Sequence, residues 1–111
     1  MKRKQRREGD SPKHRAWIRQ AQCLALHYSV GPHCRGRVQA AHIRTGTDGG
    51  MGKKPHDKWC VPLCALHHGE QHQVGETRFW KKYDLGIESA RATALAFAKW
   101  SPDPAIRGAA E

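Results

Sequence analysis

The stretch Cys60-Val-Pro-Leu-Cys64-Ala-Leu-His67-His68-Gly-Glu-Gln-His72 decides the fold of this 111-residue chain. Residues 59–63 are a short apolar run typical of a buried strand, and residues 64–72 are predicted to form a helix that begins at a tight turn. Five side chains of the quoted stretch are thiols or imidazoles, the ligands that zinc prefers in proteins. We therefore expect a strand that leads directly into a helix carrying metal ligands.

The metal ligands of this helix cannot all face one ion, because adjacent helical residues point about 100° apart. His68 and His72 lie one turn apart on the same face, so both imidazoles can reach one ion. Cys64 and His67 instead have the spacing of half a zinc site. The sequence therefore predicts an open metal site at His68 and His72 and a separate structural zinc. The predicted ligands of the structural zinc are Cys23, Cys34, Cys64 and His67.

Two of the four zinc ligands have an alternative, since His27 or His33 could replace either Cys23 or Cys34. Cys60 is expected to be a buried apolar residue of the strand. The chain has four Cys and eight His but no export signal, which favours metal ligation over a disulfide scaffold.

The composition indicates a nucleic-acid partner. The chain carries 20 Lys and Arg against 10 Asp and Glu, a net charge of +10 with a pI near 10.0. Such an excess attracts a polyanion, and nucleic acid is the commonest one in a cell. No run approaches the roughly 20 apolar residues that a membrane helix needs, and no apolar signal region follows the basic N-terminus. We therefore expect a cytoplasmic protein with no membrane association.

The chain divides into an arm, a domain and a tail. Residues 1–12 are expected to form a disordered basic arm that a phosphate backbone orders, or else a merely solvated tail. Residues 13–100 form the expected domain, and residues 101–111 a flexible C-terminal tail. The other expected elements of the domain are helices over residues 13–22, 76–83 and 87–100, a strand over residues 38–44 and a glycine-rich loop over residues 45–57. The side chains expected to cover the core are Phe79, Trp80, Leu85, Leu95, Phe97 and Trp100. Together, the expected helices and strands predict a small, mostly helical α+β fold.

Further segments complete a pattern with the quoted stretch: Ala40-Ala41-His42-Ile43-Arg44, Gly50-Met51-Gly52, Pro62-Leu63-Cys64, and His67-His68 through Trp80. The combined pattern resembles the HNH nucleases, which have the ββα-metal fold. More narrowly, it is similar to the Ref-type phage nucleases, which act with RecA, and to their phage relatives. The resemblance covers about residues 20–100. It depends on the whole pattern, since no single dipeptide is specific.

The resemblance implies a ββα-metal motif and assigns roles to some of its residues. It implies that His42, at the end of the first strand, is the general base that activates water, and that His68 and His72 bind a divalent ion. Mg2+ or Mn2+ is the expected ion, although imidazole ligands also suit Zn2+ or Ni2+. The family usually has Asn in the middle of the motif, but this chain contains no Asn. Asp57 is the expected replacement, with His56 as the alternative.

The function that the resemblance implies is a metal-dependent DNA endonuclease or nickase of low sequence specificity, phage-encoded and related to recombination, in a bacterial host cell. Its expected partners are DNA, including single strands or recombination intermediates, and a RecA-type recombinase filament. The residues expected to contact DNA are Arg44, Lys53, Lys54, Lys2, Arg3, Lys4, Arg6 and Arg7. The alternative is a non-catalytic zinc-dependent nucleic-acid-binding module. Two departures from the family pattern favour it: Asp57 stands in place of the usual Asn, and Ala41 stands where many HNH proteins have a metal ligand. An RNA substrate, the cleavage pattern and the oligomeric state are also left open.

Overall fold

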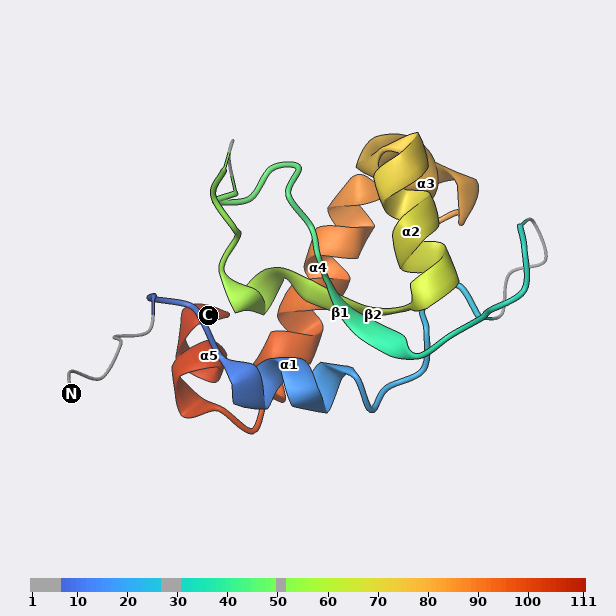
Figure 1. Ribbon diagram of the computed structural model, residues 1–111. Helices are drawn as coiled ribbons and strands as arrows, with labels where there is room; N and C mark the ends of the chain where they lie inside the picture. Colours follow the sequence, from blue (N-terminus) through green and yellow to red (C-terminus); the bar gives the residue numbers. More distant parts are fainter. Residues whose placement is uncertain (1–6, 27–30, 50–51) are drawn as a thin grey trace.

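The computed structural model describes residues 7–26, 31–49 and 52–111, which form a small, mostly helical α+β fold (Figure 1). The elements in chain order are α1 (Pro12–Ile18), β1 (Val38–His42), the 3-10 helix η1 (Asp57–Trp59), β2 (Cys60–Cys64), α2 (Ala65–Val74), α3 (Glu76–Lys82), α4 (Gly86–Lys99) and α5 (Pro104–Ala109). The predicted fold class is confirmed at this level. Each helix and strand expected within the domain is present, with its ends shifted by a few residues.

The two strands pair as an antiparallel hairpin in which Val38 lies opposite Cys64 and His42 lies opposite Cys60. β2 is buried at every position, and α1, α2 and α4 all contact it. Figure 1 shows the hairpin at the centre of the molecule with these helices around it. The register brings His42 close to η1, which begins at Asp57 immediately before β2. The end of one strand and the start of the other thus form one part of the candidate site.

The junction of β2 and α2 brings the predicted zinc ligands together. Cys64 ends the strand and caps the helix, because its sulfur accepts a hydrogen bond from the backbone N–H of His67 at 3.4 Å. Pro62 is tolerated within β2 because a two-stranded sheet leaves one edge of each strand unpaired. Its carbonyl oxygen accepts a hydrogen bond from the backbone N–H of Leu24 at 3.0 Å. This bond holds the segment that contains Cys23 against the hairpin.

The helices α3 and α4 close the core on the side of β2. Phe79, Trp80 and Tyr83 are buried on α3 and at its end, and small alanines at every fourth position let α4 approach closely. The prediction that Phe79 and Trp80 cover the core is confirmed. The same prediction is wrong for Trp100, which is 81% exposed. Its position follows the last residue of α4, where the chain turns away towards α5.

The C-terminal segment differs from the flexible tail expected over residues 101–111. It contains α5, which begins at Pro104 with Asp103 as its N-cap. Ile106 is only 2% exposed and packs with Ala98 and Ala110 in a small second core. A single aliphatic side chain in a polar segment was too weak a signal to predict this helix. The ordered fold therefore extends beyond residue 100.

The end of the expected N-terminal arm is also part of the fold. Ser11 is buried, its backbone N–H donates to Asp57 at 2.7 Å, and its hydroxyl donates to Asp103 at 2.6 Å. The carbonyl oxygen of Gly9 accepts a hydrogen bond from the backbone N–H of Asp57 at 2.9 Å. Figure 1 accordingly shows α5 beside the start of α1. Residues 1–6 lie outside the described residues.

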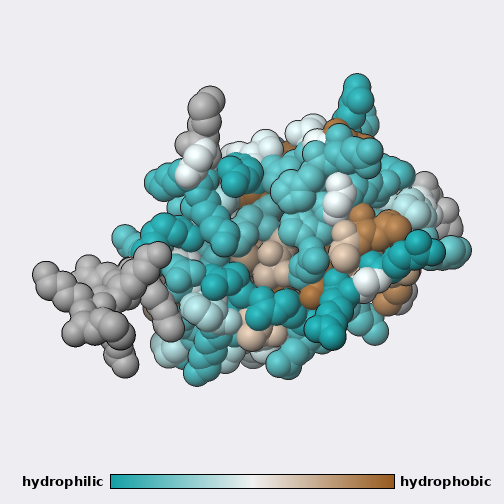
Figure 2. Space-filling model, viewed as in Figure 1, coloured by the Kyte–Doolittle hydropathy of each residue, from teal (hydrophilic) through white to brown (hydrophobic). Residues whose placement is uncertain are grey.

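One face of the molecule is mainly polar. Figure 2 shows one face on which hydrophilic residues predominate and hydrophobic residues form only small patches. Over residues 7–26, 31–49 and 52–111, the helices are all too short or too polar to cross a membrane.

Candidate functional site

Cys23, Cys34, Cys64 and His67 form a compact cluster beside the start of α2. Their ligand atoms all lie within 4.8 Å of one another. The Nδ1 atom of His67 lies 3.0 Å from the sulfur of Cys64, 3.6 Å from that of Cys34 and 3.7 Å from that of Cys23. All of these cysteines are free thiols. The structure therefore brings together the four residues that the sequence predicted for the structural zinc.

Two features of this cluster fit a zinc ion. The Nε2 atom of His67 lies 2.9 Å from the carbonyl oxygen of Pro32, so Nε2 carries the proton and Nδ1 presents its lone pair to the sulfurs. Burial and the neighbouring sulfurs raise the pKa of Cys34 to about 12. The pKa of Cys64 is instead lowered to about 7, because hydrogen bonds, chiefly from the backbone of His67, outweigh the effect of burial. A cation is needed to hold all of these sulfurs together as thiolates, and zinc binds thiolates. The Cys3His cluster is consistent with a structural zinc.

His33 is exposed and does not belong to the cluster, and His27 lies outside the described residues. Cys60 is fully buried in β2, away from the Cys3His cluster, as predicted.

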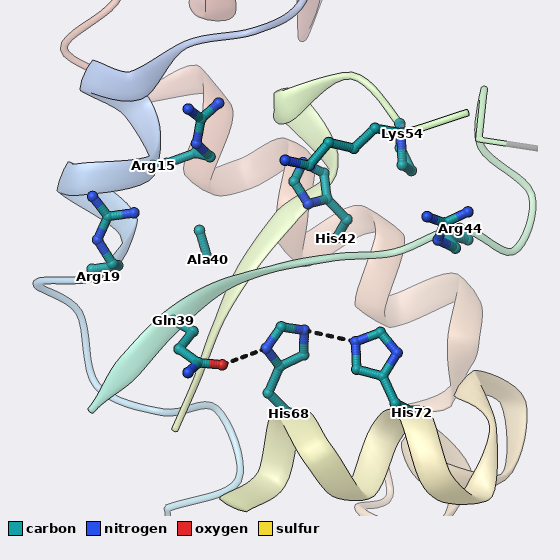
Figure 3. A pocket seen from close by; sticks show the side chains of 10 residues that line it. Arg15, Arg19, Gln39, Ala40, His42, Arg44, Lys54, His68 and His72 are labelled. Atoms are coloured by element: carbon teal, nitrogen blue, oxygen red, sulfur yellow. Dashed lines mark hydrogen bonds between the residues drawn. The ribbon is translucent and has the colours of Figure 1, made fainter. Parts of the chain in front are cut away.

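A second feature, the histidine cavity, lies between α1, the hairpin and α2 and has a volume of about 430 Å³ (Figure 3). Its lining residues are Arg15, Arg19, Gln39, Ala40, His42, Arg44, Lys54, Pro55, His68 and His72. In Figure 3, His68 and His72 project from α2 towards β1. The three histidines of the predicted catalytic site therefore line one cavity, although they come from two separate elements.

The imidazole rings of His68 and His72 lie next to each other, with centroids 4.7 Å apart. The Nδ1 atom of His68 donates to the side-chain oxygen of Gln39 at 2.6 Å, which leaves its Nε2 atom unprotonated. That Nε2 atom lies 3.1 Å from Nε2 of His72. At this separation His68 and His72 would be able to hold one divalent ion between them, since imidazole nitrogens are common metal ligands. Burial, together with the neighbouring His72 and His42, lowers the pKa of His68, which favours its neutral form.

In Figure 3, His42 lies on the other side of the β1 backbone from His68 and His72. Its Nε2 atom lies 2.7 Å from an oxygen of Asp57. Asp57, the expected residue, is therefore the partner of His42. The alternative residue, His56, instead accepts a hydrogen bond from the backbone N–H of Lys58. Because an ionised carboxylate only accepts, Nε2 of His42 carries the proton and Nδ1 keeps its lone pair. Nδ1 is thus the nitrogen of His42 that can act as a base.

The carboxylate of Asp57 is fully buried and held from several directions. Burial alone would raise its pKa, but hydrogen bonds from His42 and the Ser11 amide, together with the guanidinium of Arg15, lower the pKa to about 2. Asp57 is therefore ionised at neutral pH. The ionised carboxylate keeps the proton of the His42 imidazole on Nε2.

The donor atoms of His42, Asp57 and Cys60 also lie within 4.8 Å of one another. The Asp57 oxygens are already bonded to His42, Ser11 and Arg15, and the nearby positive charge of Arg15 opposes a cation at this position. We therefore assign Asp57 to the orientation of His42.

Comparisons with known proteins place the chain in a family. The model of the family described as "Protein of unknown function (DUF968)" matches residues 1–97. The chain belongs to the DUF968 family. It is also similar to the Escherichia coli (strain K12) protein named "Uncharacterized protein YdfU", with 32% identity over 89 residues, which are 79% of this chain and 23% of YdfU. The chain thus spans about a quarter of the length of that relative. No solved structure matches it. Neither matching name mentions an HNH or Ref-type nuclease.

The basic residues of this DUF968 chain that are predicted to contact DNA lie in more than one place. Arg44 and Lys54 line the histidine cavity, and Lys53 lines a separate cavity with Arg7, Glu8, Asp48 and His56. Arg7 donates to the carbonyl oxygen of Lys54 at 3.3 Å. The predicted DNA contacts Lys2, Arg3, Lys4 and Arg6 lie outside the described residues.

Sequence reasoning missed two cationic residues of the site. Arg15 and Arg19 line the histidine cavity from α1 and the turn that follows it, and Figure 3 shows them on the side opposite to Arg44. Their spacing of four residues places both on one helix face, which is the signal that could have drawn attention to them. Arg15 also forms an ion pair with the buried Asp57. Arg15 therefore lines the cavity and also holds the carboxylate that orients His42.

Proposed function

We propose that this DUF968 chain is a metal-dependent endonuclease that nicks DNA with low sequence specificity. The observation that carries the proposal is the histidine cavity, which combines an oriented imidazole, a pair of imidazole ligands and four cationic side chains. A phosphodiester needs these groups for hydrolysis: a base for water, a cation for the developing charge, and positive groups for the flanking phosphates. The resemblance to HNH nucleases supports the same assignment.

In the proposed reaction, a water molecule attacks phosphorus while the bond to the 3′ oxygen breaks. Nδ1 of His42 accepts the proton of that water, and Asp57 stabilises the imidazolium that forms, because its carboxylate stays ionised. His68 and His72 would hold a divalent ion, for which Mg2+ or Mn2+ is the expected choice. When bound, this ion supplies Lewis-acid stabilisation of charge on the phosphate and the leaving oxygen. The leaving oxygen takes its proton from solvent.

The positions of the cationic residues favour a substrate that has a phosphate on each side of the scissile phosphate. Arg15 and Arg19 line one side of the cavity, and Arg44 and Lys54 line the other. Phosphate contacts of this kind position a nucleic acid without reading its sequence, which agrees with low specificity. A RecA-type filament as the partner that presents the DNA is a further part of the proposal, and it rests on the Ref-type resemblance alone.

The test is plasmid nicking with matched histidine variants. Purified chain is incubated with supercoiled plasmid and Mg2+ or Mn2+, with and without recombinase filament. We expect His42→Ala to lower the nicking rate at least about 100-fold, as is typical for the loss of a general base. His33→Ala is the matched control, because His33 is exposed, lies outside the Cys3His cluster and does not line the histidine cavity. DNA binding without cleavage in either ion would instead favour the non-catalytic binding module. Equal nicking by wild type and His42→Ala would remove His42 as the base.

A further inference from the structure

An apolar groove, lined by aromatic residues, lies between α1 and α4, outside the histidine cavity. One hollow of about 320 Å³ is lined by Trp17, Thr93, Ala96, Phe97 and Trp100. A second hollow of about 260 Å³ shares Trp17 and Phe97 and extends to Gln20 and Ala21. We call the surface formed by Trp17, Phe97 and Trp100 the aromatic groove. The proposed reaction uses none of these residues.

The aromatic groove presents ring surfaces to solvent. Trp17 and Phe97 meet edge to face, with ring centroids 6.1 Å apart. Trp100 is 81% exposed, against 44% for Leu26 and 40% for Val74, the other large exposed apolar side chains among the described residues. Single exposed apolar residues are ordinary, but three aromatic rings around one hollow are a surface that can hold a planar ligand.

The charges around the groove select the class of ligand. Lys13 is exposed and lies one helical turn before Trp17, and Lys99 is exposed and directly precedes Trp100. Acidic residues are absent from the described side chains that line the two hollows, and Asp103, outside them, interacts electrostatically with Lys13. Aromatic surfaces flanked by lysines are how proteins bind single-stranded nucleic acid, because bases stack on the rings while ammonium groups contact the phosphates.

α1 connects this groove to the histidine cavity. Arg15 and Arg19 line the cavity from one side of α1 and its following turn, whereas Trp17 and Gln20 line the groove from the other side. A strand that crosses α1 could therefore contact both surfaces. Only a single strand exposes base faces for stacking, because those of a duplex are already stacked on their neighbours.

We infer that the aromatic groove is a stacking site for the bases of single-stranded nucleic acid. This inference rests on the proposed function, because it specifies that the nucleic acid entering the histidine cavity would be single-stranded. The site itself would bind whether or not the chain cleaves. A second copy of the chain is the main competing occupant of such an apolar surface.

The test compares two probes of equal length and charge, a labelled oligothymidylate 20-mer and an abasic 20-mer with the same phosphates. Binding is measured by fluorescence anisotropy without added Mg2+ or Mn2+, so that cleavage plays no part. We expect wild type to bind the oligothymidylate at least about tenfold more tightly than the abasic strand. Trp100→Ala should remove most of this preference and leave abasic binding within about twofold.

Matched variants separate stacking from charge and from folding. Leu26→Ala truncates another exposed apolar residue and should preserve the preference for bases. Lys99→Ala should weaken binding of both probes by a similar factor, since both carry the same phosphates. Thermal unfolding of Trp100→Ala verifies that this exposed truncation leaves the fold intact.

Three results would overturn the inference. The first is equal wild-type affinity for the two probes, and the second is an equal loss for both in Trp100→Ala. The third is a wild-type dimer in sedimentation velocity that becomes a monomer in Trp100→Ala, since the groove would then hold a second copy. His42→Ala should retain the preference for bases, so a failure of the proposed nuclease function and a failure of this site remain distinguishable.

Discussion

Nε2 of His42 lies 2.7 Å from an oxygen of Asp57, a residue that is fully buried and also paired with Arg15. This contact joins the last residue of β1 to the first residue of η1. It leaves the Nδ1 lone pair of His42 as the site for a proton, because the carboxylate accepts from Nε2. The orientation of one imidazole thus depends on a helix, α1, that lies far from it in the sequence.

Replacing the buried carboxylate should destabilise the fold in a pH-dependent way. The pKa of Asp57 falls from 3.8 to about 2 on folding, which corresponds to roughly 2 kcal/mol of stability. Because the folded pKa is the lower one, this stability is fully present above about pH 4 and is lost as the pH falls towards 2. In urea unfolding at pH 7, the free energy of unfolding of Asp57→Asn should be lower than that of wild type by about this amount. The difference between the two should narrow below pH 4.

Asp84→Asn is the control for this measurement, because Asp84 is exposed and its left-handed backbone, with φ of 61°, suits Asn equally well. A gap for Asp57→Asn that is as large at pH 3 as at pH 7 would contradict the assigned pKa direction.

Removing a ligand of the Cys3His cluster should release a structural zinc. We expect one tightly held zinc per wild-type chain after dialysis against a weak chelator, and none in Cys64→Ala, which should lose several kcal/mol of stability. Elemental analysis and thermal unfolding measure the two effects. Cys60→Ala is the matched control, since Cys60 is equally buried in β2 but lies outside the cluster, and it should keep its zinc. A folded, zinc-free Cys64→Ala chain would refute a structural role for the metal.

The histidine pair on α2 should bind a second divalent ion. His72→Ala removes one of two imidazoles whose Nε2 atoms lie 3.1 Å apart, so the affinity for Mn2+ should fall at least about tenfold. Titration of zinc-loaded protein with Mn2+, followed by electron paramagnetic resonance, measures this affinity. Gln73→Ala, at the neighbouring exposed position of α2, should leave it unchanged. Identical Mn2+ binding by wild type, His68→Ala and His72→Ala would exclude the pair as ligands.

The C-terminal helix should contribute to stability. Ile106→Ala empties a position that is 2% exposed and packs against Ala98 and Ala110, so it should cost about 2–4 kcal/mol. Chemical unfolding of this variant is compared with that of Glu111→Ala, an exposed residue of the same segment. A loss below about 0.5 kcal/mol for Ile106→Ala would instead be typical of a flexible tail.

Much of the fold could be predicted because its signals are local. The run Cys60–Cys64 is apolar at each position, and α4 repeats small residues at every fourth position, so periodicity alone indicates a strand and a helix. The zinc ligands could be predicted for a different reason. Few residue types bind zinc, and their density around Cys64 and His67 is unusual for a chain of this size.

Other parts of the site could not be predicted, because they depend on residues far apart in the sequence. Arg15 and Asp57 are 42 positions apart, and neither shows by its local sequence that it pairs with the other. The choice of Nε2 as the protonated nitrogen of His42 depends on that buried ion pair. The burial of Ser11 against Asp103 likewise requires the two ends of the fold to meet.

By itself, the sequence determined the order of helices and strands up to residue 100, the positive charge and the Cys64 and His67 half of the Cys3His cluster, since these follow from side-chain chemistry and short-range spacing. Only the tertiary structure decided which arginines line the histidine cavity, how Asp57 orients His42, and that Trp17 and Trp100 form a groove with Phe97. These features arise when α1, the hairpin and α4 pack together, and long-range packing leaves little trace in the local pattern of a single sequence.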